Sequence, residues 1–134
     1  MPQTAVGKSV SSFCRDVKIR GGVAIYVANH VNAVPLSDNL LNLSEELHFE
    51  AAGVNVNDLQ LISLYRSLDG NFEYFIMKLC RLLDGLDYRK QIVLTGDFNV
   101  RFNTLQHQAQ ELVNLFSCYG FMPIVSQNTR TQVV

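Results

Sequence analysis

The pattern of apolar and polar positions along this chain of 134 residues changes several times, and each change predicts an element. Residues 1–12 are small and polar with no sustained period, which predicts a loose N-terminal segment. Residues 23–27 (VAIYV) follow a pair of glycines and form a short apolar run typical of a strand buried on both faces. Residues 47–56 and 59–65 flank an Asn-Asp turn and predict an antiparallel hairpin.

The spacing of apolar residues then lengthens from the period of a strand to that of a helix. Residues 71–84 carry apolar side chains at helical spacing, so they predict an amphipathic helix that lies on a sheet. Residues 92–95 return to a strand, 104–118 form a second helix, and 121–125 form a last strand. This order of elements favours one mixed α/β layered domain over residues 13–134.

Composition and charge place the chain among ordinary globular proteins. Its 48% hydrophobic and 17% charged residues are close to average usage, which excludes a disordered or collagen-like chain. The 11 Lys and Arg against 12 Asp and Glu give a net charge of -1, so no global basic field indicates a nucleic-acid partner. This sum does not exclude a metal-dependent nuclease, because acidic residues in its site would mask local basic groups.

The sequence shows no targeting or membrane-spanning segment. Its first twenty residues lack the apolar core of a secretory signal, and no apolar run approaches the ~20 residues of a membrane-spanning helix. Its three cysteines are widely spaced and odd in number, which favours reduced thiols over a disulfide framework. We therefore expect an intracellular protein, nuclear or cytoplasmic, that is not secreted and has no membrane partner.

The candidate chemistry lies at the end of the strand predicted over 92–95, in the stretch Gly-Asp-Phe-Asn. In an extended backbone Asp97 and Asn99 project to one side, while Phe98 projects to the other and anchors the loop in the core. The carboxylate can orient or deprotonate a water, and the amide can donate to a phosphate oxygen. The alternative is an Asx-turn, in which the two side chains cap the next segment without any chemistry.

Several motifs taken together, "GGVAIYV", "LISLYRS", the amphipathic helix, "IVLTGDFNV" and "NTRT", resemble the central part of the endonuclease/exonuclease/phosphatase family. The closest likeness is to the endonuclease domain of non-LTR retrotransposon polyproteins, and it covers about residues 13–131. "GDFN" is its most specific element, whereas "YRS" departs from the family's usual YRPP. The resemblance implies a partial four-layer α/β sandwich with mixed, mainly antiparallel sheets flanked by helices, and DNA as the partner of the full-length family.

The resemblance also implies roles for three catalytic positions. Asp97 matches the family's aspartate that aligns or activates the attacking water, and Asn99 matches its partner on the scissile phosphate. Tyr65 resembles the tyrosine whose hydroxyl reaches that phosphate. A phenol can donate a hydrogen bond without ionising at neutral pH, but a strand-end aromatic packed on the following helix is the alternative for Tyr65.

Three further positions resemble substrate-binding residues of the family. Arg66 follows Tyr65 and is a candidate clamp on the phosphate backbone, since a guanidinium fork fits phosphate oxygens. Thr129 and Arg130 match a segment that touches DNA. The alternatives are a solvated loop charge for Arg66 and a frayed tail for the other two. The three histidines are scattered without the spacing of metal ligands, and Glu50 matches a family glutamate to which no role can be transferred.

The family cleaves phosphodiesters with a divalent metal, Mg²⁺ (or Mn²⁺), held by acidic ligands from its N-terminal part, and with a C-terminal Ser-Asp-His-like motif. This sequence begins after the first set and stops before the second. We therefore expect the metal ligands to lie outside this chain and the isolated chain to be inactive or nearly so. Open sheet edges would then invite association. An active phosphoesterase completed by a partner, acting on DNA or a small phosphate ester, and a non-catalytic nucleic-acid-binding module remain alternatives.

Overall fold

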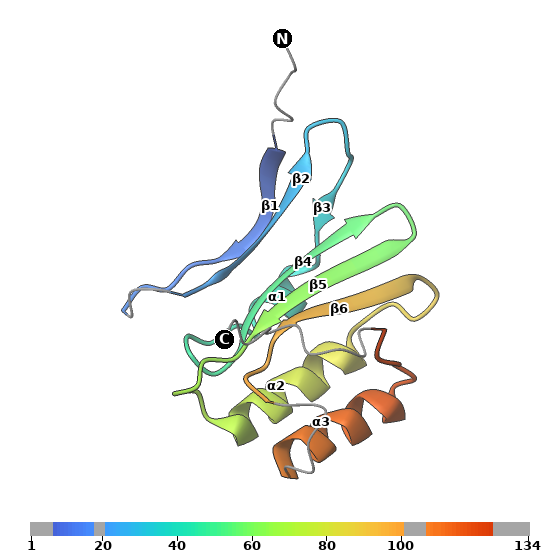
Figure 1. The fold of residues 1–134 in the computed structure, drawn as a ribbon. Helices are drawn as coiled ribbons and strands as arrows, with labels where there is room; N and C mark the ends of the chain where they lie inside the picture. Colours follow the sequence, from blue (N-terminus) through green and yellow to red (C-terminus); the bar gives the residue numbers. More distant parts are fainter. Residues whose placement is uncertain (1–6, 18–20, 101–106, 125–134) are drawn as a thin grey trace, which may run out of the picture. The chain divides into compact units, whose positions relative to one another are not determined.

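A computed structural model describes residues 7–17, 21–100 and 107–124. The chain is mixed α/β, with two sheets and three helices in its described part, and it divides into two compact units, Met1–Asn99 and Val100–Val134. The first unit contains β1 (Gly7–Phe13), β2 (Val23–Ala28), β3 (Val34–Pro35), α1 (Asp38–Leu41), β4 (Glu50–Val56), β5 (Leu59–Tyr65), α2 (Phe72–Asp84) and β6 (Gln91–Asp97), and the second contains α3 (His107–Cys118) (Figure 1). In these residues, no helix combines the length and the apolar character that crossing a bilayer requires.

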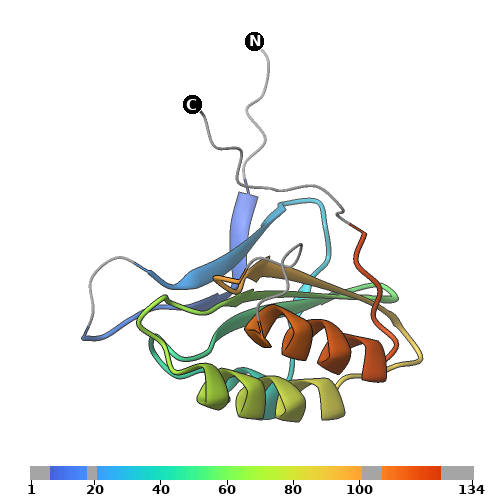
Figure 2. The same cartoon turned by 60° about the horizontal axis from the view of Figure 1, so that its bottom comes forward.

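The first unit is built from two sheets. Strands β1 and β2 form an antiparallel pair, and the other sheet has the strand order β3-β4-β5-β6. The antiparallel hairpin predicted over 47–56 and 59–65 is confirmed as β4 and β5, except that β4 begins at Glu50 and not at Leu47. Strands β5 and β6 are parallel. A parallel pair needs a crossover connection, and α2 supplies it. Figure 2 shows α2 along one face of the four-stranded sheet and the β1-β2 pair over the other.

Helix α2 confirms the helix predicted over 71–84. The side chain of Asn71 caps its first turn by accepting a hydrogen bond from the backbone N–H of Tyr74 at 3.0 Å. Its apolar stripe is buried, and the ring of Phe75 lies 5.6 Å from that of Phe49 and 5.8 Å from that of Phe98. The alternate residues of β5 that share this face are also buried, so the predicted packing of the helix on a sheet is confirmed.

The strand predicted over 23–27 is confirmed as β2, but it is buried on one face only. Ile25 packs against Ala52 and Val54 of β4, whereas the neighbouring Tyr26 is 70% exposed. A pair of strands laid on another sheet covers one side, so alternate residues of β2 face solvent. The backbone N–H of Gly53 donates to Ser11 Oγ at 3.0 Å, which joins the two sheets by a hydrogen bond.

Two further sequence predictions differ from the structure. Residues 7–12 belong to strand β1 and not to a loose segment, because all of them except Val10 pair with β2 in an antiparallel ladder that is irregular between Ser9 and Ser11. Residues 1–6 lie outside the described residues. Residues 121–124 form no strand: the Phe121 N–H donates to the carbonyl of Phe116 at 2.9 Å, and their rings are in contact. The helix predicted over 104–118 is confirmed from 107 onward; residues 104–106 and Val125 lie outside the described residues.

Candidate functional site

The sheet brings three polar residues from three strands into one row. Tyr65 of β5 is the register partner of Glu50 in the antiparallel pairing and of Asp97 in the parallel pairing. Register partners share a face of the sheet, so the three side chains lie on one side, at the end where β5 and β6 finish. It is the side that faces β1 and β2, because Ala52, two residues after Glu50, packs against Ile25. We call these residues the strand-end row.

The backbone at the end of β6 is sharply shaped. Gly96 has a φ of 150°, and a Cβ at this position would collide with the carbonyl oxygen of Leu64. Asn99 has a φ of 53°, in the left-handed region, so the extended backbone assumed from the sequence ends before it. Asp97 and Asn99 therefore do not project to one side as alternate residues of a strand would. Phe98 anchors the loop as predicted, through its ring contact with Phe75.

Asp97 and Asn99 are linked to each other. Asp97 Oδ1 accepts a hydrogen bond from the backbone N–H of Asn99 at 3.0 Å, which is the contact of an Asx-turn. The side-chain amide of Asn99 donates to the carbonyl oxygen of Arg66. The sequence alternative of an Asx-turn is thus present, and a catalytic role for either side chain stays a prediction.

Arg66 is buried, so the alternative of a solvated loop charge is wrong. Its guanidinium nitrogens donate to three backbone carbonyls, those of Phe98, Asn99 and Gly70. Burial lowers the pKa of this guanidinium, and the charge of Asp97 acts in the opposite direction. An arginine stays protonated under such shifts, so a cation lies beside the Asp97–Asn99 loop. Its ring neighbour is Phe72, 5.2 Å from the guanidinium carbon.

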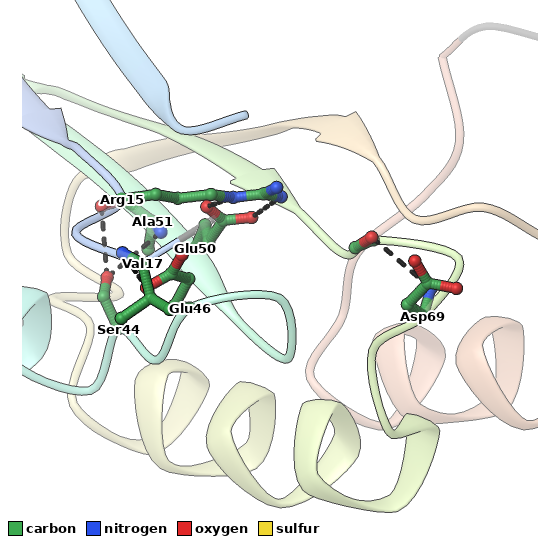
Figure 3. A network of polar contacts seen from close by, with 8 residues as sticks. Arg15, Val17, Ser44, Glu46, Glu50, Ala51 and Asp69 are labelled. Atoms are coloured by element: carbon green, nitrogen blue, oxygen red, sulfur yellow. Dashed lines mark hydrogen bonds and ion pairs between the residues drawn. The ribbon is translucent and has the colours of Figure 1, made fainter. Parts of the chain in front are cut away.

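At the Glu50 end of the strand-end row, Arg15 forms an ion pair with Glu50. Arg15 Nε and Nη2 donate to the two carboxylate oxygens of Glu50, each at 2.6 Å, and the side chains are 6% and 0% exposed (Figure 3). The hydrogen bonds to Glu50 raise the pKa of the Arg15 guanidinium, while burial opposes this rise. The same guanidinium carbon lies 5.5 Å from the centre of the Tyr65 ring. The half-buried Tyr65 therefore lies between Glu50 and Asp97 in the sheet, and the Arg15 guanidinium lies over its ring.

Short polar contacts hold the chain around Glu50. The N–H of Ala51 donates to Ser44 Oγ at 3.1 Å, and the N–H of Val17 donates to Glu46 Oε2 at 3.3 Å (Figure 3). Sequence reasoning missed this network. A charged residue between the apolar Phe49 and Ala51 of a hairpin strand was the available signal for a buried ion pair, but no local pattern points to Arg15 as the partner.

The described residues do not fit a divalent metal. Among residues 7–17, 21–100 and 107–124, no three His, Cys, Asp or Glu side chains gather to hold one. Both carboxylate oxygens of Glu50 are bound by Arg15, and Asp97 Oδ1 accepts from Asn99. The two carboxylates stand two strand spacings apart, about 10 Å at Cα, whereas Mg²⁺ needs several oxygen ligands in near-octahedral order.

Thr129 and Arg130 lie outside the described residues. His48 Nδ1 accepts a hydrogen bond from the N–H of Asn71 at 2.8 Å, at the start of α2. No protein-family model matches this chain, and no curated protein or solved structure matches it either.

Proposed function

We propose that this chain is part of a metal-dependent phosphodiester hydrolase of the endonuclease/exonuclease/phosphatase type, similar to the endonuclease domains of non-LTR retrotransposons. The observation that carries the proposal is the pairing of Tyr65 with Asp97 across β5 and β6. The resemblance assigns these two residues to one phosphate-binding site although they are 32 positions apart in the sequence. Their pairing as register neighbours on adjacent strands supports that assignment.

The fold supports the proposal in part. Two sheets face each other in the first unit and α2 covers the outer face of one of them, an arrangement that a partial four-layer α/β sandwich would contain. In the described residues β6 is the last strand of its sheet, and an open edge of this kind would allow association with another strand. We propose the sandwich as the complete architecture to which these layers belong.

The side chains of the strand-end row could act on a water and bind a phosphate. Asp97 would orient or deprotonate a water, and the Tyr65 hydroxyl would donate to a phosphate oxygen. Because the described residues do not fit Mg²⁺ or Mn²⁺, no hydrolytic step through a metal can be derived from them. We therefore expect them not to cleave DNA. An intracellular location, nuclear or cytoplasmic, suits such a role and the reduced thiols of the three cysteines.

A plasmid-nicking assay with Mg²⁺ or Mn²⁺ tests the proposal. The chain is compared with Asp97→Ala and with the control Asp87→Ala, whose carboxylate precedes β6 at the end opposite to Asp97, a strand length of about 20 Å. We expect no nicking above the metal alone from any of the three. Nicking that needs both the metal and Asp97, and that survives in Asp87→Ala, would show that the chain completes an active site and would overturn the expected inactivity.

The lack of a metal fit among the described residues favours a second candidate, a non-catalytic nucleic-acid-binding module. Binding to an oligonucleotide that weakens steeply with salt, without cleavage, would support it. Hydrolysis of a small phosphate ester without any effect on DNA would instead indicate a phosphatase of the same fold. If the folded protein showed neither binding nor hydrolysis, DNA would be rejected as the partner.

A further inference from the structure

Arg66 lies where three segments of the first unit meet. Its backbone N–H donates to the carbonyl oxygen of Asp97 at 3.0 Å, which extends the β5-β6 pairing by one residue. Its guanidinium donates from Nε to the carbonyl of Phe98 at 2.9 Å, from Nη2 to that of Asn99 at 3.2 Å and from Nη1 to that of Gly70 at 3.2 Å. In return, the Asn99 side-chain amide donates to the Arg66 carbonyl. One residue thus contacts all three members of the Asp97–Asn99 loop and the turn that leads into α2.

We infer that Arg66 is the positioning residue of the Asp97–Asn99 loop, and that its guanidinium is committed to this loop and does not bind a substrate phosphate. The inference rests on the proposed function for the role of Asp97 and Asn99 in a site. The contacts that Arg66 makes are a property of the fold and hold whether or not the chain acts on DNA.

Burial and hydrogen bonding both favour this reading over a phosphate clamp. Arg66 is only 4% exposed, and each of its three guanidinium nitrogens already donates to a carbonyl. Turning the Arg66 guanidinium toward a phosphate in solvent would break three charge-assisted hydrogen bonds, which are stronger than hydrogen bonds between neutral groups. A planar guanidinium can serve three acceptors in fixed directions, whereas the single ammonium nitrogen of a lysine cannot.

The loop needs such a support because its backbone is unfavourable for its sequence. Asn99 has a φ of 53°, a region that most residues other than glycine avoid, although asparagine tolerates it better than most. Two of the contacts that hold it there are made by its backbone: its N–H donates to Asp97 Oδ1, and its carbonyl accepts from Arg66 Nη2. Loss of the second contact lets Asn99 relax, and the N–H that fixes the Asp97 carboxylate then moves with it. The position of Asp97 therefore depends on Arg66.

The test uses the full chain with Arg66→Lys and Arg66→Met, and with Arg89→Lys as the control. Arg89 also donates through its guanidinium, from two nitrogens to the Asp87 carboxylate, but its side chain is 91% exposed. The first readout is the three-bond NMR coupling between the amide and α protons of Asn99, which reports φ. The second is the exchange rate of the Asn99 amide. We expect both Arg66 variants to shift the coupling away from its left-handed value and to raise exchange by about tenfold or more, and the control to change neither.

Unchanged coupling and exchange in both Arg66 variants would overturn the inference. A salt titration of oligonucleotide binding gives an independent check. If Arg66 bound a phosphate, Arg66→Met would lower the slope of log affinity against log salt by about 0.7 while leaving Asn99 unchanged, and that result would also overturn the inference. Absence of oligonucleotide binding by the unmodified chain would count against the proposed function, and the NMR readouts would still decide the role of Arg66.

A measurement on the unmodified chain covers the case in which the variants fail to fold. The Nε–H of Arg66 donates inside the protein, whereas that of Arg89 donates at an exposed position. We expect the Arg66 Nε–H to exchange with solvent at least about tenfold more slowly than the Arg89 Nε–H. Equal rates for the two groups would contradict the commitment of Arg66 to the loop.

Discussion

Arg15 and Glu50 form a two-pronged ion pair in which both nitrogen–oxygen distances are 2.6 Å and neither side chain is substantially exposed. The pair joins the segment after β1 to the first residue of β4. Because the Glu50 carboxylate is fully buried, removing its partner leaves a charge without compensation, which costs more than the pair itself contributes.

The first prediction concerns this ion pair. Arg15→Met should lower the free energy of unfolding by about 3 kcal/mol or more, the range measured when one partner of a buried pair is removed. The double variant Arg15→Met/Glu50→Leu should recover most of the loss, because no buried charge remains. Urea unfolding of the two variants checks this. A double variant as unstable as the single one would show that the pair stabilises the fold in its own right.

The second prediction concerns pH. The hydrogen bonds of Arg89 lower the pKa of Asp87 from 3.8 to about 2. Since the folded-state pKa lies below the ordinary value, the stabilisation by this pair is present above pH 3.8 and is lost as the pH falls toward 2. An NMR titration of the Asp87 carboxyl carbon should give a midpoint near 2 in the unmodified chain and a higher midpoint in Arg89→Ala, in which the backbone N–H of residue 89 still donates to the carboxylate but the guanidinium no longer does. High salt should move the first midpoint toward the second, and identical midpoints in both proteins would contradict the prediction.

The third prediction concerns two glycines at which an added side chain should lower the free energy of unfolding by different amounts. Gly96 and Gly120 both have positive φ, at 150° and 83°. A Cβ at Gly96 would collide with backbone, whereas a Cβ at Gly120 would meet nothing within 4 Å. Gly120→Ala should therefore cost about 1–2 kcal/mol for the backbone conformation alone. Gly96→Ala should cost clearly more, because β5 and β6 must separate there. Chemical denaturation measures both, and equal losses would show that the collision is relieved cheaply.

The fourth prediction concerns the core under α2. Phe75 is fully buried between Phe49 and Phe98, so Phe75→Ala should lower the free energy of unfolding by about 3–5 kcal/mol. Met77 lies on the same helix but is 40% exposed, and Met77→Ala should stay within about 0.5 kcal/mol of the unmodified chain. Thermal unfolding followed by circular dichroism gives the comparison. A loss in Met77→Ala as large as in Phe75→Ala would mean that the exposed face of α2 is also packed.

The sequence predicted those elements whose own pattern determines them. The stripe of α2 and the alternation of the β4-β5 hairpin are local signals, and both are confirmed. Strand β1 was not predicted because its residues are mostly serine, lysine and glycine. Its stability comes from backbone pairing with β2 and from the hydrogen bond between Ser11 and Gly53. A polar strand of this kind carries no apolar alternation to read.

The side-chain contacts around the candidate site were beyond prediction for a different reason. Arg15 is 35 positions from Glu50, and the Arg66 guanidinium donates to carbonyls 32 and 33 positions away. Such pairs are settled by sheet register and by a crossover connection, neither of which a single sequence displays. Asp97 is a candidate from its place at the end of a predicted strand, whereas Tyr65 is a candidate only through the family resemblance. The left-handed turn at Asn99 is consistent with its residue type, but nothing in the sequence requires it.

The parallel pairing of β5 with β6 also determines which residues of the strand-end row come together first during folding. Glu50 and Tyr65 meet when a hairpin with a two-residue turn closes, and hairpins form within microseconds. Asp97 arrives only after the chain through α2 has crossed the sheet, a non-local contact whose loop-closure entropy slows folding. Pulse-labelling of amides during refolding should therefore protect β4 before β6, and the reverse order would refute this sequence of events. A chain in which only this hairpin has formed would hold Glu50 and Tyr65 side by side while still lacking the carboxylate of Asp97, which gives the row its proposed chemistry.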